Sequence, residues 1–153
     1  HGYTYVVATR DHHIQPGAHF SDEPDFVDSW PPHCVVGTPG AEFHDELTFR
    51  DFAAVFNKGE YEPAYSAFEG ATADRETLAH WLRVRGVDQV DICGIATDYC
   101  VRATALDATR EGFKTTVLLD LTAAVDAHRV AEISAELVKA GVTVTQQAGT
   151  STS

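Results

Sequence analysis

The sequence predicts an α/β protein built on a doubly wound parallel sheet, that is, a sheet with helices on both faces. Two observations carry this prediction: short apolar runs alternate with amphipathic stretches, and a glycine follows each amphipathic stretch. Strands that alternate with helices at this spacing are joined by right-handed crossovers and therefore run parallel. The length of 153 residues suits one domain, and we expect a single domain over 1–153.

The individual elements follow from the spacing of apolar residues. The amphipathic stretches repeat apolar side chains at helical spacing, as at Leu78, Trp81 and Leu82, and they predict helices over 74–85, 98–111 and 126–140. The strand-like runs are shorter and more continuously apolar, as in TTVLLDL. They predict strands over 3–9, 53–56, 89–94, 115–121 and 142–145, and the final GTSTS is expected to fray.

The composition excludes several kinds of partner. Asp and Glu number 23 against 11 Lys and Arg, which gives a formal charge of −12. Phosphate backbones and anionic lipid surfaces repel such a chain, so neither nucleic acid nor membrane is expected as a partner. The three cysteines form no C-x-x-C motif, which favours thiols in a reducing compartment and a cytoplasmic protein. Cys93 is assigned to the core of a strand, while Cys34, next to His33, is left open between core and site.

Ligands of parallel α/β sheets bind beyond the carboxyl ends of the strands. The site is therefore expected after Thr9, after Phe56 and after Gly94. The first of these positions leads into a long loop, 11–46, that is rich in Pro, His and Asp. Loops of that length without regular structure are commonly functional or disordered, and the histidine and aromatic content here favours function.

The third strand end leads into the string IATDYC. Thr97 or Asp98 is expected to cap the following helix, which leaves Cys100 in its first turn. The helix dipole and the unpaired amides of a first turn favour a thiolate, and the same amides can hold an oxyanion. Cys100 is thus the candidate nucleophile. The alternative interpretation is a small buried helix residue, the commoner role of cysteine.

The long loop contains a candidate metal site made of Asp11, His13, His19 and His33. Residues two apart in an extended segment face the same side, so Asp11 and His13 can converge while His12 points away. Three imidazoles and one carboxylate suit a divalent transition metal with positions left for water or substrate. A set of surface histidines in an acidic loop is the alternative.

Lys58 and Trp30 complete the candidates. A lysine at the carboxyl end of a parallel strand, as in NKG, points into the ligand crevice, where it can stabilise a thiolate or a developing negative charge. Two prolines after Trp30 fix the backbone and can hold the indole as a wall for a flat ring. A solvated lysine and a core tryptophan are the alternatives.

Taken together, the chain resembles the nicotinamidases (pyrazinamidases) of the isochorismatase-like cysteine hydrolases. The resemblance extends over nearly the whole chain, and the joint presence of four strings makes it specific. The strings are VVATRDHHIQPGAHF (6–20), SWPPHCVVGTPGAEFH (29–44), VFNKGEYEPAYSAFEG (55–70) and GVDQVDICGIATDYCVRATALDA (86–108).

The resemblance implies a role for each candidate. Cys100 corresponds to the nucleophile and Lys58 to the catalytic lysine, and the amides of Ala96 and Cys100 would form the oxyanion hole. Ile95–Ala96 corresponds to a non-proline cis peptide that aims this hole. The implied substrate-binding residues are Trp30, Tyr65, Ile95, Ala96 and Tyr99, and the implied cofactor is one divalent metal ion (zinc, iron or manganese) held by Asp11, His13, His19 and His33.

The sequence departs from the family in one important respect. The family begins with a strand and a D-x-Q-x-D-F string whose first aspartate is the general base, and these 153 residues contain no such string. We therefore expect the domain to be N-terminally incomplete, lacking a strand and crossover helix of roughly 30 residues. A polypeptide that began at His1 would fold poorly and show little activity. Two mild departures are His12, where the family often has an aromatic residue, and Tyr99, where it has His.

The expected activity is hydrolysis of a small aromatic amide through a thioester acyl-enzyme: nicotinamide, and also pyrazinamide, to the acid and ammonia, with a role in NAD salvage. One alternative is a related amidase acting on another small amide or carbamoyl substrate. The other is a non-catalytic metal-binding domain, which the absent aspartate favours. A homo-oligomer is possible in each case.

Overall fold

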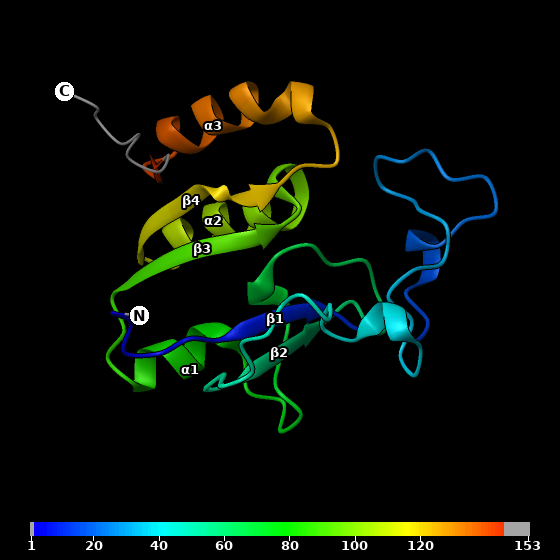
Figure 1. The fold of residues 1–153 in the computed structure, drawn as a ribbon, viewed down its shortest axis with the longest axis horizontal. Helices are drawn as coiled ribbons and strands as arrows, with labels where there is room; N and C mark the ends of the chain where they lie inside the picture. The colour runs from blue at the N-terminus through cyan, green and yellow to red at the C-terminus, as the bar shows by residue number, and fades with distance from the viewer. Residues whose placement is uncertain (1, 146–153) are drawn as a thin grey trace. The chain divides into compact units, whose positions relative to one another are not determined.

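The structure is a computed structural model, and it describes residues 2–145. All hydrogen-bonded strand pairs in this range are parallel, and helices separate several of the strands, as expected of an α/β protein. The chain divides into two compact units, one up to residue 78 and one from residue 79 (Figure 1). The hydrogen bonds form two sheets, β1–β2 and β3–β4–β5, one in each unit. The expectation of one continuous doubly wound sheet is therefore met in part.

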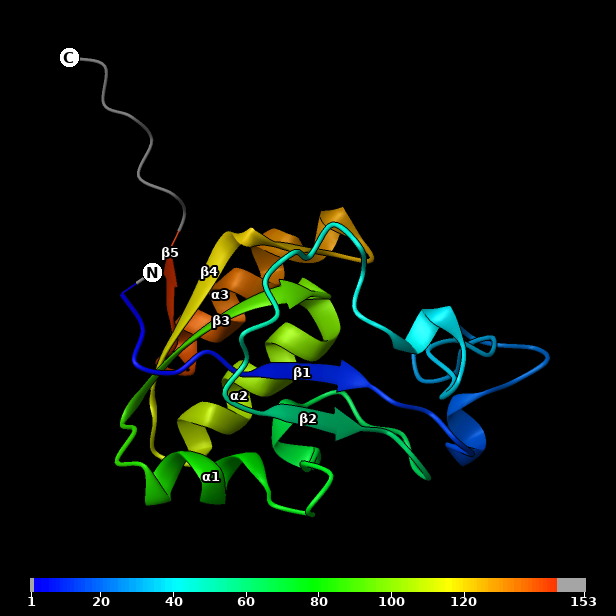
Figure 2. The ribbon, with the colours of Figure 1, turned by 60° about the horizontal axis from the view of Figure 1, so that its bottom comes forward.

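The N-terminal unit is built around β1 (Ala8–Asp11) and β2 (Val55–Lys58), which lie side by side in Figure 2. Their register pairs Ala8 with Val55 and Asp11 with Lys58, so both strands end at the same level. Phe56 of β2 is fully buried. The strands thus deliver an aspartate and a lysine, side by side, to the carboxyl edge of the sheet.

The loop after β1 is ordered by short-range backbone pairing instead of long strands. Isolated bridges join His13 to Val35 and Phe20 to Trp30, and single helical turns form at Gly17–His19 and Pro39–Ala41. These bridges fold the loop back on itself. Distant histidines of the loop are brought together in this way.

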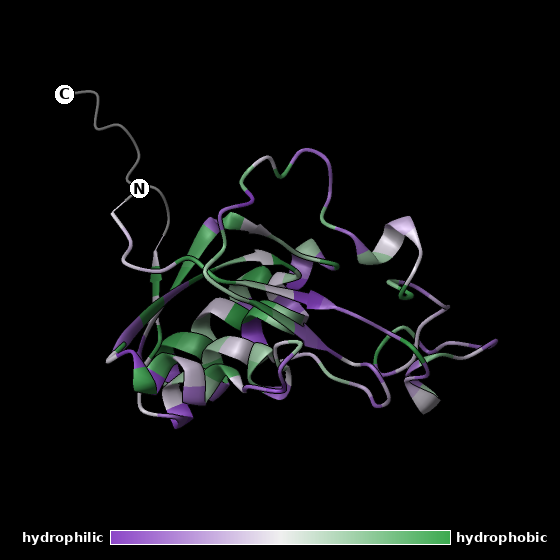
Figure 3. Cartoon of the chain, turned by 90° about the horizontal axis from the view of Figure 1, so that it is seen from below, coloured by the Kyte–Doolittle hydropathy of each residue, from purple (hydrophilic) through white to green (hydrophobic). Residues whose placement is uncertain are grey.

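The C-terminal unit consists of three parallel strands and three helices, and the last two of these helices pack on the strands. Its elements are α1 (Leu78–Val84), which starts at the boundary, then β3 (Gln89–Ile95), α2 (Arg102–Arg110), β4 (Lys114–Ala123), α3 (Val130–Lys139) and β5 (Thr143–Thr145). The core brings together side chains of α2, β4 and α3, with Ala105, Val117, Ile133 and Leu137 almost fully buried. Figure 3 shows both hydrophobic and hydrophilic stretches on the helices, as expected of amphipathic helices.

Several boundaries differ from the expected ones. The first helix begins at Leu78 instead of residue 74, because Arg75 has a left-handed φ of 67° and Ala71 bridges to Thr77, which makes 72–76 a turn. The first strand is paired over Ala8–Asp11, not 3–9, and the second extends to Lys58. The third helix is preceded by a helical turn at Ala127–Arg129. The GTSTS tail lies outside the described residues.

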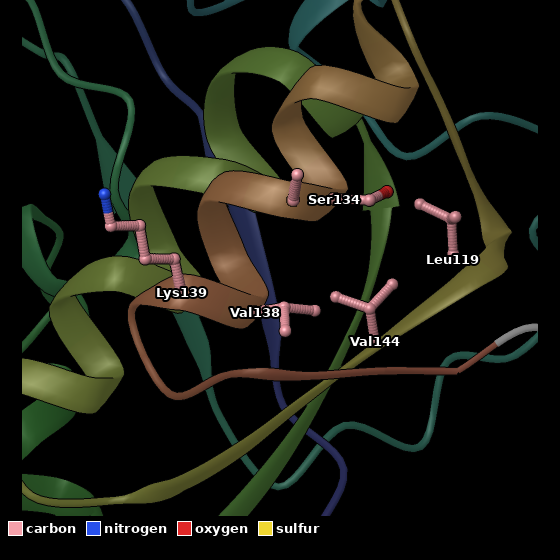
Figure 4. A pocket seen from close by; sticks show the side chains of 6 residues that line it. Leu119, Ser134, Val138, Lys139 and Val144 are labelled. Atoms are coloured by element: carbon pink, nitrogen blue, oxygen red, sulfur yellow. The ribbon is translucent and has the colours of Figure 1, made fainter.

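Among residues 2–145, none of the helices has the length and apolar character that crossing a bilayer requires. The described elements include a hydrophobic pocket in the C-terminal unit, lined by Leu119 of β4, Val144 of β5 and Ser134, Val138 and Lys139 of α3 (Figure 4). None of the predicted site residues lines this pocket.

Candidate active site and metal centre

The ends of β1 and β2 hold a buried ion pair. Lys58 is 4% exposed, and its Nζ donates a hydrogen bond to Oδ1 of Asp11, its register partner on the neighbouring strand. The second carboxylate oxygen, Oδ2, lies 3.9 Å from Nε2 of His13. Asp11 therefore joins the lysine to the histidine loop, and its two oxygens face different partners.

Three histidines from this loop converge beside the ion pair. The ligand nitrogens of His13, His19 and His33 lie within 4.8 Å of one another, and His13 and His19 are buried. Nε2 of His19 and Nε2 of His33 are 3.4 Å apart. The side chains alternate along this segment as expected. Asp11 and His13 approach each other, whereas His12 points away, and its Nδ1 lies 3.2 Å from Oε1 of Glu60.

Backbone carbonyls orient two of these rings. Nδ1 of His13 donates to the carbonyl of Gly59 at 2.6 Å, and Nδ1 of His33 donates to the carbonyl of Pro31 at 2.8 Å. In each ring the Nε2 lone pair is therefore the one that can bind an ion. Metal-bound histidines usually have this arrangement, in which the other ring nitrogen donates to a carbonyl or carboxylate. Within residues 2–145, the buried Nε2 of His13 and Nδ1 of His19 have no hydrogen-bond partner.

Burial keeps the imidazoles of His13 and His19 neutral. Burial lowers the pKa of His13 below its usual 6.5 and, with the neighbouring His13 and His33, lowers that of His19 to about 4. Neutral imidazole is the form that binds metals. A buried, unpartnered nitrogen beside two other imidazoles and a carboxylate is expensive for the fold unless an ion occupies the centre. The residues therefore fit a divalent cation.

The predicted four-ligand set falls into two overlapping groups. The three histidines form one, and the carboxylate of Asp11 forms the other with His33 and Cys34. Cys34, which the sequence left between core and site, is half-buried and belongs to this second group.

Trp30 and Tyr65 lie next to the histidines. The indole Nε1 of Trp30 donates to the Tyr65 hydroxyl at 3.1 Å, and the Tyr65 ring meets the His19 ring edge-on with centroids 5.7 Å apart. Phe26 packs edge-on against Trp30 at 5.9 Å. Two of the five predicted substrate-binding residues are therefore in contact with each other and beside the histidines.

Asp25 organises the turn that leads to Trp30, a role that the sequence analysis missed. Its Oδ1 accepts hydrogen bonds from the amides of Val27, Asp28 and Ser29, at 2.9 to 3.0 Å, and from the Ser29 hydroxyl at 3.0 Å. These bonds hold the pKa of Asp25 well below its usual range. The signal in the sequence is an aspartate in a loop, because an aspartate side chain in a turn commonly accepts the backbone amide two residues on, here that of Val27.

The remaining predicted site residues lie in the C-terminal unit, at the end of β3. The Ile95–Ala96 peptide is cis, as the resemblance implies. A single wide turn of π-helix, Thr97–Val101, follows and holds the half-buried Cys100 just before α2. The amides of Tyr99 and Val101 both donate to the Ala96 carbonyl, at 3.2 and 3.0 Å, which closes the turn. Cys100 thus lies in the first turn of the helical segment.

Neither Thr97 nor Asp98 caps this helix through its side chain. Asp98 instead accepts the amides of Val125 and Asp126 at 2.9 and 3.0 Å, and the Thr97 hydroxyl donates to Thr122 at 2.8 Å. Both side chains hold the end of β4 and the loop after it, whereas the backbone carbonyl of Ala96 accepts the amides of Tyr99 and Val101. The cap prediction was wrong.

The assignment of Cys93 to the core was also wrong. Ile92 packs against the core of the C-terminal unit, and alternation along β3 turns the next side chain, Cys93, to the opposite and exposed face.

Comparison with known proteins agrees with this fold. Residues 3–149 match the Isochorismatase domain family, and the chain belongs to that family. Within it, the chain is 56% identical over 140 residues to the nicotinamidase/pyrazinamidase of Mycobacterium tuberculosis, an alignment that covers 92% of this chain and 75% of that protein. It is 36% identical to the nicotinamidase of Escherichia coli, where 75% of this chain and 61% of the relative are covered.

Two solved structures are similar to this chain in fold and sequence. A pyrazinamidase of Pyrococcus horikoshii in complex with zinc is 39% identical, with a TM-score of 0.78, covering 93% of this chain and 75% of that one. PnC1 from L. infantum in complex with nicotinate is 38% identical, with a TM-score of 0.80, covering 94% and 72%. Both structures are longer than the aligned region.

Proposed function

We propose that this protein is a metal-containing cysteine amidohydrolase that converts nicotinamide to nicotinate and ammonia. The observation that carries the proposal is the 56% identity to a nicotinamidase/pyrazinamidase over 92% of the chain. Nicotinamidases of four further organisms are among the similar proteins, and one similar structure contains nicotinate. We extend the proposal to pyrazinamide, which the M. tuberculosis relative's name includes.

The proposed metal ligands are Asp11, His13, His19 and His33. Their support is the convergence of the three imidazoles and the unpartnered, buried Nε2 of His13. Imidazole and carboxylate together suit zinc, iron or manganese, and a similar pyrazinamidase contains zinc. A bound cation would supply positive charge that orients the substrate ring or lowers the pKa of a bound water.

The proposed nucleophile is Cys100 and the proposed catalytic lysine is Lys58. The thiolate attacks the amide carbon, the amides of Ala96 and Cys100 bind the oxyanion, and the C–N bond breaks as the departing nitrogen takes up a proton and leaves as ammonia. Water then cleaves the thioester and releases the acid. Lys58 supplies positive charge that favours the thiolate. Proton transfer falls to a general base, the carboxylate of an aspartate. The family string that holds this base is not in the 153 residues.

The proposed substrate pocket consists of Trp30, Tyr65, Ile95, Ala96 and Tyr99. The hydrogen bond between Trp30 and Tyr65 supports the first two as a fixed aromatic wall, because it restricts rotation of both rings. A flat aromatic amide would stack against such a wall. We further propose a single doubly wound domain in a cytoplasmic protein that forms a homo-oligomer.

A second candidate function rests on a specific observation. The chain is 33% identical over 117 residues to a maleamate amidohydrolase of Pseudomonas putida, an enzyme named for a non-aromatic amide. A related amidase with a different small substrate is therefore the alternative. A substrate panel distinguishes the two, because greater turnover of maleamate or a ureido compound than of nicotinamide would favour the alternative.

The decisive experiment measures ammonia release from nicotinamide by the complete gene product and its Cys100→Ala variant. We expect the variant to lose activity and the matched Cys93→Ala variant to keep it. Substantial ammonia release by Cys100→Ala would rule out the thioester mechanism. Turnover of nicotinamide by neither the parent protein nor Cys93→Ala would rule out the proposed activity.

A further inference from the structure

Cys34 belongs to a second group of potential ligands at the edge of the histidine centre. Its Sγ, a carboxylate oxygen of Asp11 and a ring nitrogen of His33 lie within 4.8 Å of one another. All three residues are half-buried. The group shares His33 with the three-histidine set and contains neither His13 nor His19.

The backbone explains how two consecutive residues reach the same point. In an extended chain the side chains of His33 and Cys34 would face opposite sides. Cys34, however, has a φ of 47°, in the left-handed region that side chains other than glycine, asparagine and aspartate rarely adopt. This turn breaks the alternation, so that the imidazole and the thiol belong to one cluster.

The position of Cys34 is also fixed by its neighbours. Its carbonyl accepts the amide of His13 at 3.0 Å, and the amide of Val36 donates to the His13 carbonyl at 2.9 Å. These two bonds hold 34–36 against the segment that carries Asp11 and His13. The sulfur, the carboxylate and the imidazole are therefore preorganised, and no long loop has to close before they can bind an ion.

We propose that Asp11, His33 and Cys34 form a second coordination site that binds a soft divalent cation, zinc or cadmium, through a thiolate. Thiolate, imidazole and carboxylate are all zinc ligands, and the sulfur favours softer ions over manganese or iron bound by nitrogen and oxygen alone. Water would complete the coordination. The proposal goes beyond the amidase activity and does not depend on the substrate.

The second site shares Asp11 and His33 with the proposed four-ligand centre, and the sharing of His33 makes the two sites mutually exclusive. Its Nδ1 donates to the Pro31 carbonyl, so Nε2 is the nitrogen that remains for an ion. One lone pair cannot serve two ions. A cation held by Cys34 therefore competes with the ion of the three-histidine centre, and the protein is expected to bind one of the two at a time.

The test uses cadmium, because a thiolate–cadmium bond gives an ultraviolet charge-transfer absorption that nitrogen and oxygen ligands do not give. The metal-free full chain is titrated with cadmium chloride. We expect an absorption that saturates at one equivalent, is lost in Cys34→Ser and is kept in Cys93→Ser and Cys100→Ser. Absence of the band from the parent protein, or its persistence in Cys34→Ser, would overturn the proposal, as would its loss in Cys100→Ser.

A second measurement needs no variant, in case Cys34→Ser does not fold. The parent protein is alkylated with iodoacetamide with and without cadmium, and the modified cysteine is located by mass spectrometry. Protection confined to Cys34 is the expected result, and equal alkylation of Cys34 in both samples would contradict it. Both readouts are independent of nicotinamide turnover, so failure here and failure of the amidase proposal are distinguishable.

Discussion

The imidazole of His13 and the backbone of Gly59 are in direct contact, and the contact leaves no room for a side chain. The Gly59 carbonyl accepts the Nδ1 proton of His13 at 2.6 Å, and a Cβ on Gly59 would lie 2.7 Å from that same nitrogen. Gly59 also has a φ of 74°, which disfavours any other residue. The glycine of the NKG string therefore positions His13, a proposed metal ligand in the loop after the neighbouring strand.

Gly59→Ala is expected to displace His13. The left-handed backbone alone costs about 1 kcal/mol for alanine, and the overlap with the ring adds about 1–3 kcal/mol. The matched control is Gly86→Ala, since Gly86 has a φ of 70° but a Cβ there would meet nothing within 4 Å. Urea unfolding and zinc titration of both variants measure the effect. Equal stability and equal zinc affinity in the two variants would contradict the positioning role.

Lys58→Met is expected to destabilise the fold by about 2 kcal/mol, because it leaves the Asp11 carboxylate without its buried cationic partner. Asp11 is about one quarter exposed, so water compensates part of the loss. The double variant Lys58→Met/Asp11→Asn should recover part of the stability in urea unfolding. Strict additivity of the two substitutions would show that the pair contributes no coupling energy.

The metal-free protein is expected to lose stability as the pH falls from about 6.5 to about 4. His19 has a pKa of about 4 in the folded state against 6.5 when exposed, so the unfolded chain binds more protons throughout this window. The free energy of unfolding then rises with pH, and its decrease from pH 7 to pH 5 is on the order of 1–2 kcal/mol for this group. Unfolding curves of the parent and His19→Gln proteins measure it. An identical pH dependence of the two would exclude His19 as the cause.

Asp25→Ala is expected to weaken binding of nicotinate while leaving the thermal midpoint nearly unchanged. The carboxylate holds the turn before Trp30 through four hydrogen bonds but is itself fully exposed. Tryptophan fluorescence during nicotinate titration reports both the freedom of Trp30 and the affinity. Asp28→Ala, in the same turn, is the control, because its part in these bonds is through its backbone amide. A response to Asp28→Ala as large as that to Asp25→Ala would remove Asp25 from this role.

Part of the site could be predicted because it depends on short-range rules. Alternation in an extended segment is enough to place Asp11 and His13 together and His12 apart. The order of strands and helices predicts parallel pairing, and parallel pairing aligns the ends of β1 and β2. Those rules could not give the register that sets Asp11 beside Lys58, since register is fixed by the whole pair of strands.

Other features required the folded chain, because they depend on contacts between residues far apart in sequence. The carbonyl of Gly59 is 46 residues from the ring it orients, and the hydroxyl of Tyr65 is 35 residues from Trp30. The left-handed turn at Cys34 reverses the alternation that sequence reasoning relies on. Asp98 was expected to cap a helix but binds the loop after β4 instead, because the Ala96 carbonyl already closes the turn.

The sequence by itself determined the kinds of residues available for chemistry and the order of the elements that carry them, since composition, periodicity and motif strings are local properties. Only the tertiary structure decided which nitrogen of His13 and of His33 is left for an ion, which carboxylate oxygen of Asp11 faces the lysine, and that Cys34 lies beside the proposed metal ligands. Those outcomes are set by backbone carbonyls and strand register, which distant segments supply when the chain folds.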